Sequence, residues 1–131
     1  MAPAVKNLSL VFKALSDETR LAMLALLLRH QELCVCDFVE VLGITQSKAS
    51  RHLRYLHNAG LLQDRRDTQW VHYRIREQAG QDAREVLRAV RPLLETRPLD
   101  DLEQRLARWL AAKERKPGAC SGQQPSKDSS R

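Results

Sequence analysis

The sequence lacks the features that would place it in a membrane, outside the cell or among thiol enzymes. It has no run of 18 apolar residues, the length that a membrane-spanning helix needs. Its first residues lack the charged segment, apolar run and cleavage signal of an export peptide. The three cysteines form no CxxC pair, and their odd number does not suit a disulfide framework. These absences predict a cytoplasmic protein with reduced thiols, no membrane association and no enzymatic activity.

The length and composition predict one folded domain followed by a tail. A chain of 131 residues has room for one hydrophobic core but not for two. Residues 1–115 contain the periodic apolar positions and are expected to form this domain. In residues 116–131, eight of the sixteen are Pro, Gly or Ser, which is typical of a disordered tail. Cys120 lies in this tail.

Residues 32–62 contain two predicted helices joined by a tight turn. Apolar residues recur at helical spacing from Val35 to Leu42 and stop at Gly43, which suits a helix C-terminus. Thr45 is expected to cap a second helix that runs to about Ala59. The apolar stripe of this second helix is Ala49, Leu53 and Leu56. Its opposite face carries Ser47, Ser50, Arg51 and Arg54, an arrangement that suits a helix lying in a DNA major groove.

The flanking segments complete a mostly α-helical fold with a small β-hairpin, a winged helix-turn-helix. Helices are predicted at residues 5–15, from residue 17 to about 30, at 81–95 and from residue 98 onward. The second of these is apolar on more than one side and should be the most buried. Alternating residues predict strands at 61–65 and 70–75, with residues 66–69 as a basic wing loop. Pro92 should kink or end the helix that contains it.

The first helix and the last two carry more apolar surface than one small winged helix can cover. The expected use of this surface is a twofold interface, which makes the protein a homodimer. The DNA-binding helices of the two subunits would then face the two halves of a palindromic DNA site.

Positive charge is concentrated on the predicted helix-turn-helix and wing. Residues 45–76 have a net charge of +5, whereas the whole chain has +6. A charge gathered on one motif predicts a polyanionic partner, here double-stranded DNA. The expected contacts include Lys48 and Arg54 on the helix, and Arg65 and Arg66 on the wing, where they would touch phosphates.

Cys34 and Cys36 stand where the first helix of the motif should begin. Residues i and i+2 of a helix point about 200° apart, so a helical backbone would keep their sulfurs from sharing one ion. In an extended segment they lie on one side. We therefore expect that a bound ion unwinds or re-aims the first turn. We also expect the positive helix end to lower the thiol pKa and favour the thiolate.

Three segments together resemble the ArsR/SmtB family of winged-helix metalloregulatory repressors, most closely its arsenical-resistance branch. They are ELCVCDF, SKASRHLRYLHNAGLL and DRRDTQWVHYRI, and the resemblance covers roughly residues 8–76 well. It implies a homodimeric repressor that leaves its operator when trivalent arsenic or antimony, As(III) or Sb(III), binds to cysteine. It also implies that Gln46, Ser47, Ser50 and Arg51 contact DNA.

The cysteine set departs from this branch in one respect. Well-known members have a third cysteine where Val39 stands here. The expected ligands are therefore Cys34 and Cys36, with Cys120 as either a third ligand or an inert tail thiol. Three sulfurs suit a pyramidal As(III) or Sb(III), which bonds covalently to soft thiolates. The helix at 81–95 has no His, so the zinc site that some members carry there should be absent.

Other interpretations of the same residues remain open. The two cysteines could be small core residues, since unpaired cysteine is often buried. A redox sensor in which they oxidise is the main alternative function, although adjacent thiols would close a strained ring. Another metal-ion sensor is also possible on these residues. Titration with As(III) against peroxide, following operator release, separates these functions.

Overall fold

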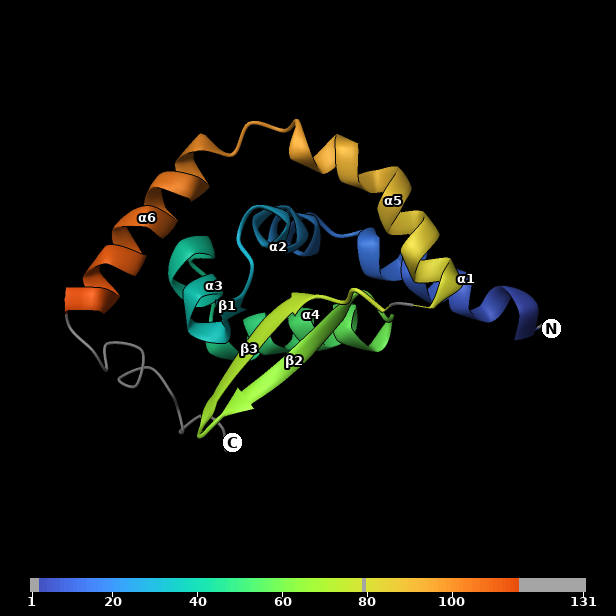
Figure 1. Ribbon diagram of the computed structural model, residues 1–131, viewed down its shortest axis with the longest axis horizontal. Helices are drawn as coiled ribbons and strands as arrows, with labels where there is room; N and C mark the ends of the chain where they lie inside the picture. The colour runs from blue at the N-terminus through green and yellow to red at the C-terminus, as the bar shows by residue number, and fades with distance from the viewer. Residues whose placement is uncertain (1–2, 79, 116–131) are drawn as a thin grey trace.

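The computed structural model describes residues 3–78 and 80–115, and in these residues the fold is mostly helical. The elements in chain order are α1 (Pro3–Leu15), α2 (Glu18–Arg29), β1 (Leu33–Cys34), α3 (Val35–Leu42), α4 (Gln46–Asn58), β2 (Leu62–Asp67), β3 (Trp70–Ile75), α5 (Gln81–Glu95) and α6 (Asp100–Arg115). Helices α5 and α6 form an arch over α2, with α3, α4 and the hairpin on the other side of α2 (Figure 1). The predicted winged helix-turn-helix is confirmed.

Helix α2 is the centre of the core, as its sequence predicts. Its N-cap Asp17 accepts a hydrogen bond from the backbone N–H of Arg20 at 3.0 Å. The five residues from Met23 to Leu27 are all buried. A helix that is apolar on several sides can be stable only when other elements surround it.

The two motif helices begin and end at the residues that the sequence indicates. Gly43 adopts a left-handed conformation with φ 67°, and its N–H bonds to the carbonyl of Val39 at 3.0 Å. Thr45 accepts a hydrogen bond from the N–H of Lys48 at 3.1 Å. Buried Phe38 on α3 belongs to the same core cluster as the apolar stripe of α4. Helix α4, which is predicted to lie in the DNA groove, therefore packs on α3 through its apolar face.

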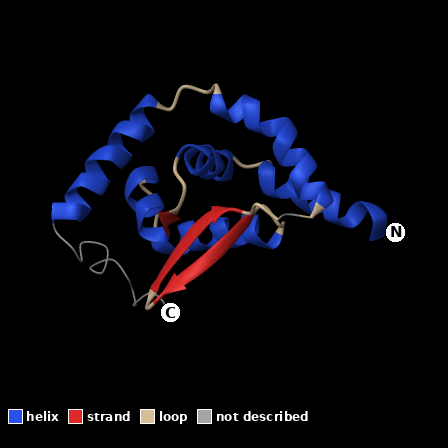
Figure 2. Ribbon diagram, viewed as in Figure 1, coloured by secondary structure: helices blue, strands red, loops and turns tan. Residues whose placement is uncertain are grey.

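The strands form a three-stranded antiparallel sheet in the order β1-β3-β2 (Figure 2). Strand β1 was not expected, because two residues show no alternation; it exists through its pairing with β3, where Leu33 lies opposite Tyr73 and Cys34 opposite His72. The wing also differs from the prediction. Arg66 belongs to β2 and lies opposite Val71, since Thr68 takes a left-handed φ of 59° and closes a shorter loop.

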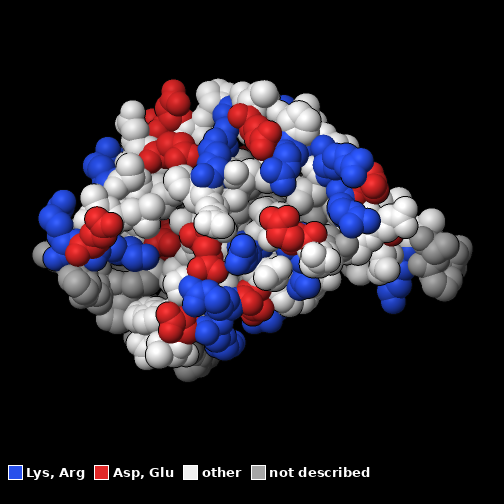
Figure 3. Space-filling model, viewed as in Figure 1, with Lys and Arg blue, Asp and Glu red and all other residues white. Residues whose placement is uncertain are grey.

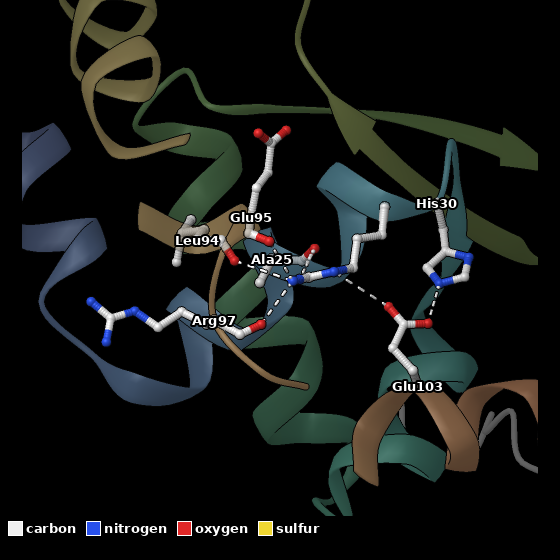
Figure 4. A network of polar contacts seen from close by, with 7 residues as sticks. Ala25, His30, Leu94, Glu95, Arg97 and Glu103 are labelled. Atoms are coloured by element: carbon white, nitrogen blue, oxygen red, sulfur yellow. Dashed lines mark hydrogen bonds and ion pairs between the residues drawn. The ribbon is translucent and has the colours of Figure 1, made fainter. Parts of the chain in front are cut away.

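Pro92 does not end its helix, contrary to one of the two expected outcomes. Helix α5 continues to Glu95, so Pro92 lies in its last turns, where few hydrogen bonds are lost. The Arg29 guanidinium of α2 donates instead to carbonyls at and just after the end of α5, where a helix lacks donors of its own. It bonds to the carbonyls of Leu94, Glu95 and Arg97 at 3.3, 3.1 and 2.9 Å, as Figure 4 shows. A cation at a helix C-terminus also suits the helix dipole.

Helix α6 packs on α3 of the same chain. Leu106 is buried, and Arg105 donates a hydrogen bond to the carbonyl of Val41 at 2.8 Å. At the start of α6, Glu103 accepts a hydrogen bond from His30 at 2.9 Å (Figure 4). Part of the apolar surface that was expected to serve a dimer interface is thus covered within one subunit. Among the described residues, the large apolar side chains that stay exposed lie mainly on α1, with Leu93 on α5 and Tyr55 on α4.

Candidate functional site

The outer face of α4 is polar and accessible. Ala49, Leu53 and Leu56 are buried beneath it. On the opposite side Ser47, Lys48, Arg51 and Arg54 are exposed, and Gln46 and Ser50 are half-buried. Three cations and two hydroxyls on the accessible part of one helix are groups that bond to phosphates and base edges. All six residues that the sequence assigns to this helix lie on α4 outside its fully buried stripe, and their contact with DNA stays a prediction.

The wing carries two exposed arginines, and one of them has an acidic partner. The guanidinium of Arg65 forms a bidentate ion pair with Glu32, with N–O distances of 2.7 and 3.1 Å. This contact lowers the pKa of the Glu32 carboxyl below its ordinary value. Figure 3 shows Lys and Arg side chains gathered over the hairpin on the face viewed, with acidic residues among them. Because Arg65 is paired with Glu32, exposed Arg66 is the wing arginine that is more available to a phosphate.

The sulfurs of Cys34 and Cys36 lie 3.3 Å apart. The sequence-based expectation that they diverge is wrong, because the backbone changes conformation between them. Cys34 is extended, with φ −86° and ψ 157°, and ends β1, whereas Cys36 lies in the first turn of α3. The two side chains consequently converge without any unwinding of the helix.

This separation fits a single soft ion. Two sulfurs 3.3 Å apart, each about 2.3 Å from a shared ion as in zinc–thiolate bonds, subtend about 92° at that ion. A trivalent ion with a lone pair keeps its bonds near right angles, so the pair suits As(III) or Sb(III). A tetrahedral ion at the same bond length needs sulfurs about 3.8 Å apart.

Both cysteines are buried, with exposed fractions of 3% for Cys34 and 2% for Cys36. Trp70 of β3 and Trp109 of α6 pack against the pair. Burial raises the pKa of the Cys34 thiol, and the nearby Asp37 carboxylate acts in the same direction. The expectation that the helix end lowers this pKa is therefore wrong: desolvation outweighs the partial charge of a short helix.

Asp37 organises the surroundings of the thiols, and the sequence-based interpretation missed it. Its side chain is buried and accepts hydrogen bonds from the N–H of Cys34 at 2.7 Å, the indole N–H of Trp109 at 2.8 Å and the ammonium of Lys113 at 2.7 Å. An acidic residue three positions after a helix cap is a sequence signal for the first of these bonds. Nothing local in the sequence indicates the two bonds to α6.

The remaining candidate ligand cannot be placed. Cys120 and the predicted tail at 116–131 lie outside the described residues. Within the part of the chain that is described, no group of three or more His, Cys, Asp or Glu side chains is arranged to hold a metal ion. The same part contains no helix that is both long and apolar enough to cross a membrane.

These features define a winged helix-turn-helix domain with two neighbouring cysteines at the start of its first motif helix. The model of the family "Bacterial regulatory protein, arsR family" matches residues 17–64. A solved structure from Mycobacterium bovis is also similar. It is described as a homodimeric winged helix-turn-helix DNA-binding domain, possibly of an ArsR-family transcriptional regulator, with a TM-score of 0.57 and 30% identity over 69% of this chain and 80% of that one. The chain belongs to the ArsR family of bacterial transcriptional regulators.

Two curated relatives are regulators of arsenic resistance. The arsenic resistance transcriptional regulator ArsR1 of Pseudomonas putida is 46% identical over 62% of this chain and 63% of its own length. The arsenical resistance operon repressor of Escherichia coli is 52% identical over 50% of this chain and 56% of its own length. The matched region thus spans little more than half of each relative.

Proposed function

We propose that this protein is a cytoplasmic, homodimeric repressor of an arsenic-resistance operon, released from its operator when As(III) or Sb(III) bonds to Cys34 and Cys36. The observation that carries the proposal is the 3.3 Å separation of the two sulfurs at the start of the helix-turn-helix. The similarity of the chain to regulators named for arsenic resistance supports the same inducer. Its role is regulatory, with no catalytic cofactor.

The chemistry at the sulfurs is a ligand exchange without oxidation. As(OH)3 loses two hydroxyl groups, each thiol gives up its proton to one of them, and two As–S bonds form while two waters leave. Arsenic stays trivalent. The third position keeps a hydroxyl group or takes the sulfur of Cys120, from either subunit.

The inducer site is connected to both DNA-binding elements. Cys34 ends β1, which pairs with the wing strand β3, and Cys36 begins α3, which seats α4. An ion that enters this buried site must displace packed atoms, since both sulfurs and the two tryptophans lie in contact. The ion therefore favours a conformation with a shifted wing or reading helix. The coupling free energy between two such sites is typically about 1–3 kcal/mol, which corresponds to a 5–150-fold loss of DNA affinity.

A second copy of the chain is the proposed cover for the exposed apolar surface. Val5 and Phe12 on α1 and Leu93 on α5 are more than half exposed, at 56%, 55% and 55%. Phe12 and Leu93 line a groove of about 690 Å³ between these helices and α2. A twofold pairing over this surface buries it and gives two reading heads.

The test is operator release in a fluorescence-anisotropy titration with DNA from an arsenic-resistance promoter. The protein should bind this DNA more tightly than a scrambled fragment, and As(III) or Sb(III) should release it. Peroxide should not. Release by peroxide alone would favour a redox sensor instead, and equal affinity for both DNAs would remove the repressor assignment.

A further inference from the structure

The two sulfurs lie beneath α6 as well as beside α3. Trp109 of α6 packs against the pair from one side, and Trp70 of the wing packs against it too. Both cysteines are buried, with exposed fractions of 3% and 2%. The two indole rings form part of their cover, so a group that bonds to both sulfurs comes to lie beside these rings.

Trp109 is held in place by its own helix and by Asp37. Its indole N–H donates to Asp37, to which the ammonium of Lys113 is also bound one turn further along α6. The same ammonium lies 5.9 Å from the centre of the Trp109 ring. At the other end of α3, Arg105 bonds to the carbonyl of Val41. Helix α6 is thus fastened to α3 on both sides of the indole.

Ligand chemistry alone does not select among trivalent arsenicals at this pair. A phenylarsenical in its dihydroxy form exchanges both hydroxyl groups for the two thiols, releases two waters and stays trivalent, so two sulfurs satisfy it completely. Inorganic As(III) keeps one position for a hydroxyl group or a third sulfur. A dithiol without further structure would therefore accept the phenyl compound readily.

The size of the substituent on arsenic is the remaining basis for selection among trivalent arsenicals. A hydroxyl group needs no more room than a water molecule, whereas a phenyl ring needs a cavity of about 150 Å³, the size that holds benzene. From these observations we infer that Trp109 sets the size limit of the inducer: its indole admits inorganic As(III) and excludes arsenicals with a large organic substituent. This inference rests on the proposed function, because it concerns the same sulfurs.

The experiment compares As(III) with phenylarsine oxide as ligands of the full-length protein. The wild type should bind As(III) at least about tenfold more tightly than phenylarsine oxide, and Trp109→Ala should reduce this ratio by about tenfold or more. Trp109→Phe is the matched control. It keeps a large ring but loses the N–H, so its ratio should stay close to that of the wild type.

If the alanine variant is unstable, Trp109→Leu provides the same comparison with a smaller change in side-chain volume. Intact operator binding shows that each variant is folded. A general loss of structure weakens both ligands together, whereas removal of the size limit changes their ratio. An unchanged ratio in Trp109→Ala and Trp109→Leu would overturn the inference alone. If As(III) binds the wild type no better than it binds Cys34→Ser/Cys36→Ser, the proposed function fails, and the inference fails with it.

Discussion

The protonation state of the buried sulfurs decides how the inducer binds. Burial raises the pKa of Cys34, so this thiol keeps its proton at neutral pH. Exchange between As(OH)3 and two protonated thiols releases water and leaves the number of bound protons unchanged. Exchange with two thiolates would instead take up two protons from the solvent. The bond to Cys34 is therefore expected to add no pH dependence to As(III) binding.

We predict that As(III) binding between about pH 6 and 8, below the ordinary thiol pKa of about 8.5, takes up fewer than two protons for each ion, because Cys34 already carries its proton. Isothermal titration calorimetry in two buffers with different ionisation enthalpies measures the proton count directly. The expected uptake is no more than one proton for each ion. An uptake approaching two protons for each ion would show that the sulfurs are thiolates before arsenic arrives.

Arg51 and Arg66 should affect DNA binding in different ways. Arg51 is exposed on α4 and is proposed to contact a base edge, so Arg51→Ala should cost about 1–3 kcal/mol on the operator and little on random DNA. Arg66→Ala should weaken both DNAs alike and reduce the slope of log K against log salt by about one unit. Anisotropy titrations at several salt concentrations distinguish them. Wild-type operator affinity for Arg51→Ala would remove this residue from the reading surface.

The elements around the thiols were predictable to different degrees. Helices α3 and α4 follow from apolar spacing, Gly43 and Thr45, which are local signals. Strand β1 has only two residues and depends on β3, about forty positions away, so no local pattern reveals it. The convergence of the sulfurs depends on that strand, which is why the interpretation from helical spacing alone was wrong.

The packing of α6 on α3 could also not be predicted from the sequence. The stripe with Leu106 and Trp109 predicts an amphipathic helix but does not state what covers it. The structure gives the answer through Asp37, whose buried carboxylate needs the donors of Trp109 and Lys113. Helical periodicity identifies the face of an element, whereas its partner depends on the tertiary arrangement.

The ion pair between Glu32 and Arg65 joins the segment before β1 to the wing. Glu32→Gln should leave Arg65 available to phosphates, tighten binding to operator and random DNA alike, and steepen the salt dependence by about one unit. Its effect on stability should be small because the pair is partly exposed. Glu40→Gln, on the exposed side of α3, removes the same charge without this ion pair. Equal salt slopes in the two variants would contradict the role given to Arg65.

The molecule as a whole presents two surfaces with separate purposes. The polar face of α4 and the wing are proposed to contact DNA, and the apolar groove at α1 and α5 is proposed to bind a second copy of the chain. Cys34 and Cys36 do not line this groove. We therefore expect that a substitution in the groove leaves the cysteine site intact.

Phe12→Asp should convert the dimer to a monomer and weaken operator binding. Phe12 is 55% exposed in one subunit, so the change places a charge in the proposed interface and disturbs the subunit core little. Sedimentation equilibrium measures the oligomeric state. Lys6→Asp, which changes an exposed residue of the same helix, is the control. A dimer that persists unchanged in Phe12→Asp would move the interface elsewhere.

Operator binding by Cys34→Ser and Cys36→Ser, measured with and without As(III), tests the central claim most directly. Serine is close to cysteine in size but does not bond to soft ions as a thiolate does. Each variant should bind the operator as the wild type does and remain bound when As(III) is added. Normal release by either single variant would contradict the account.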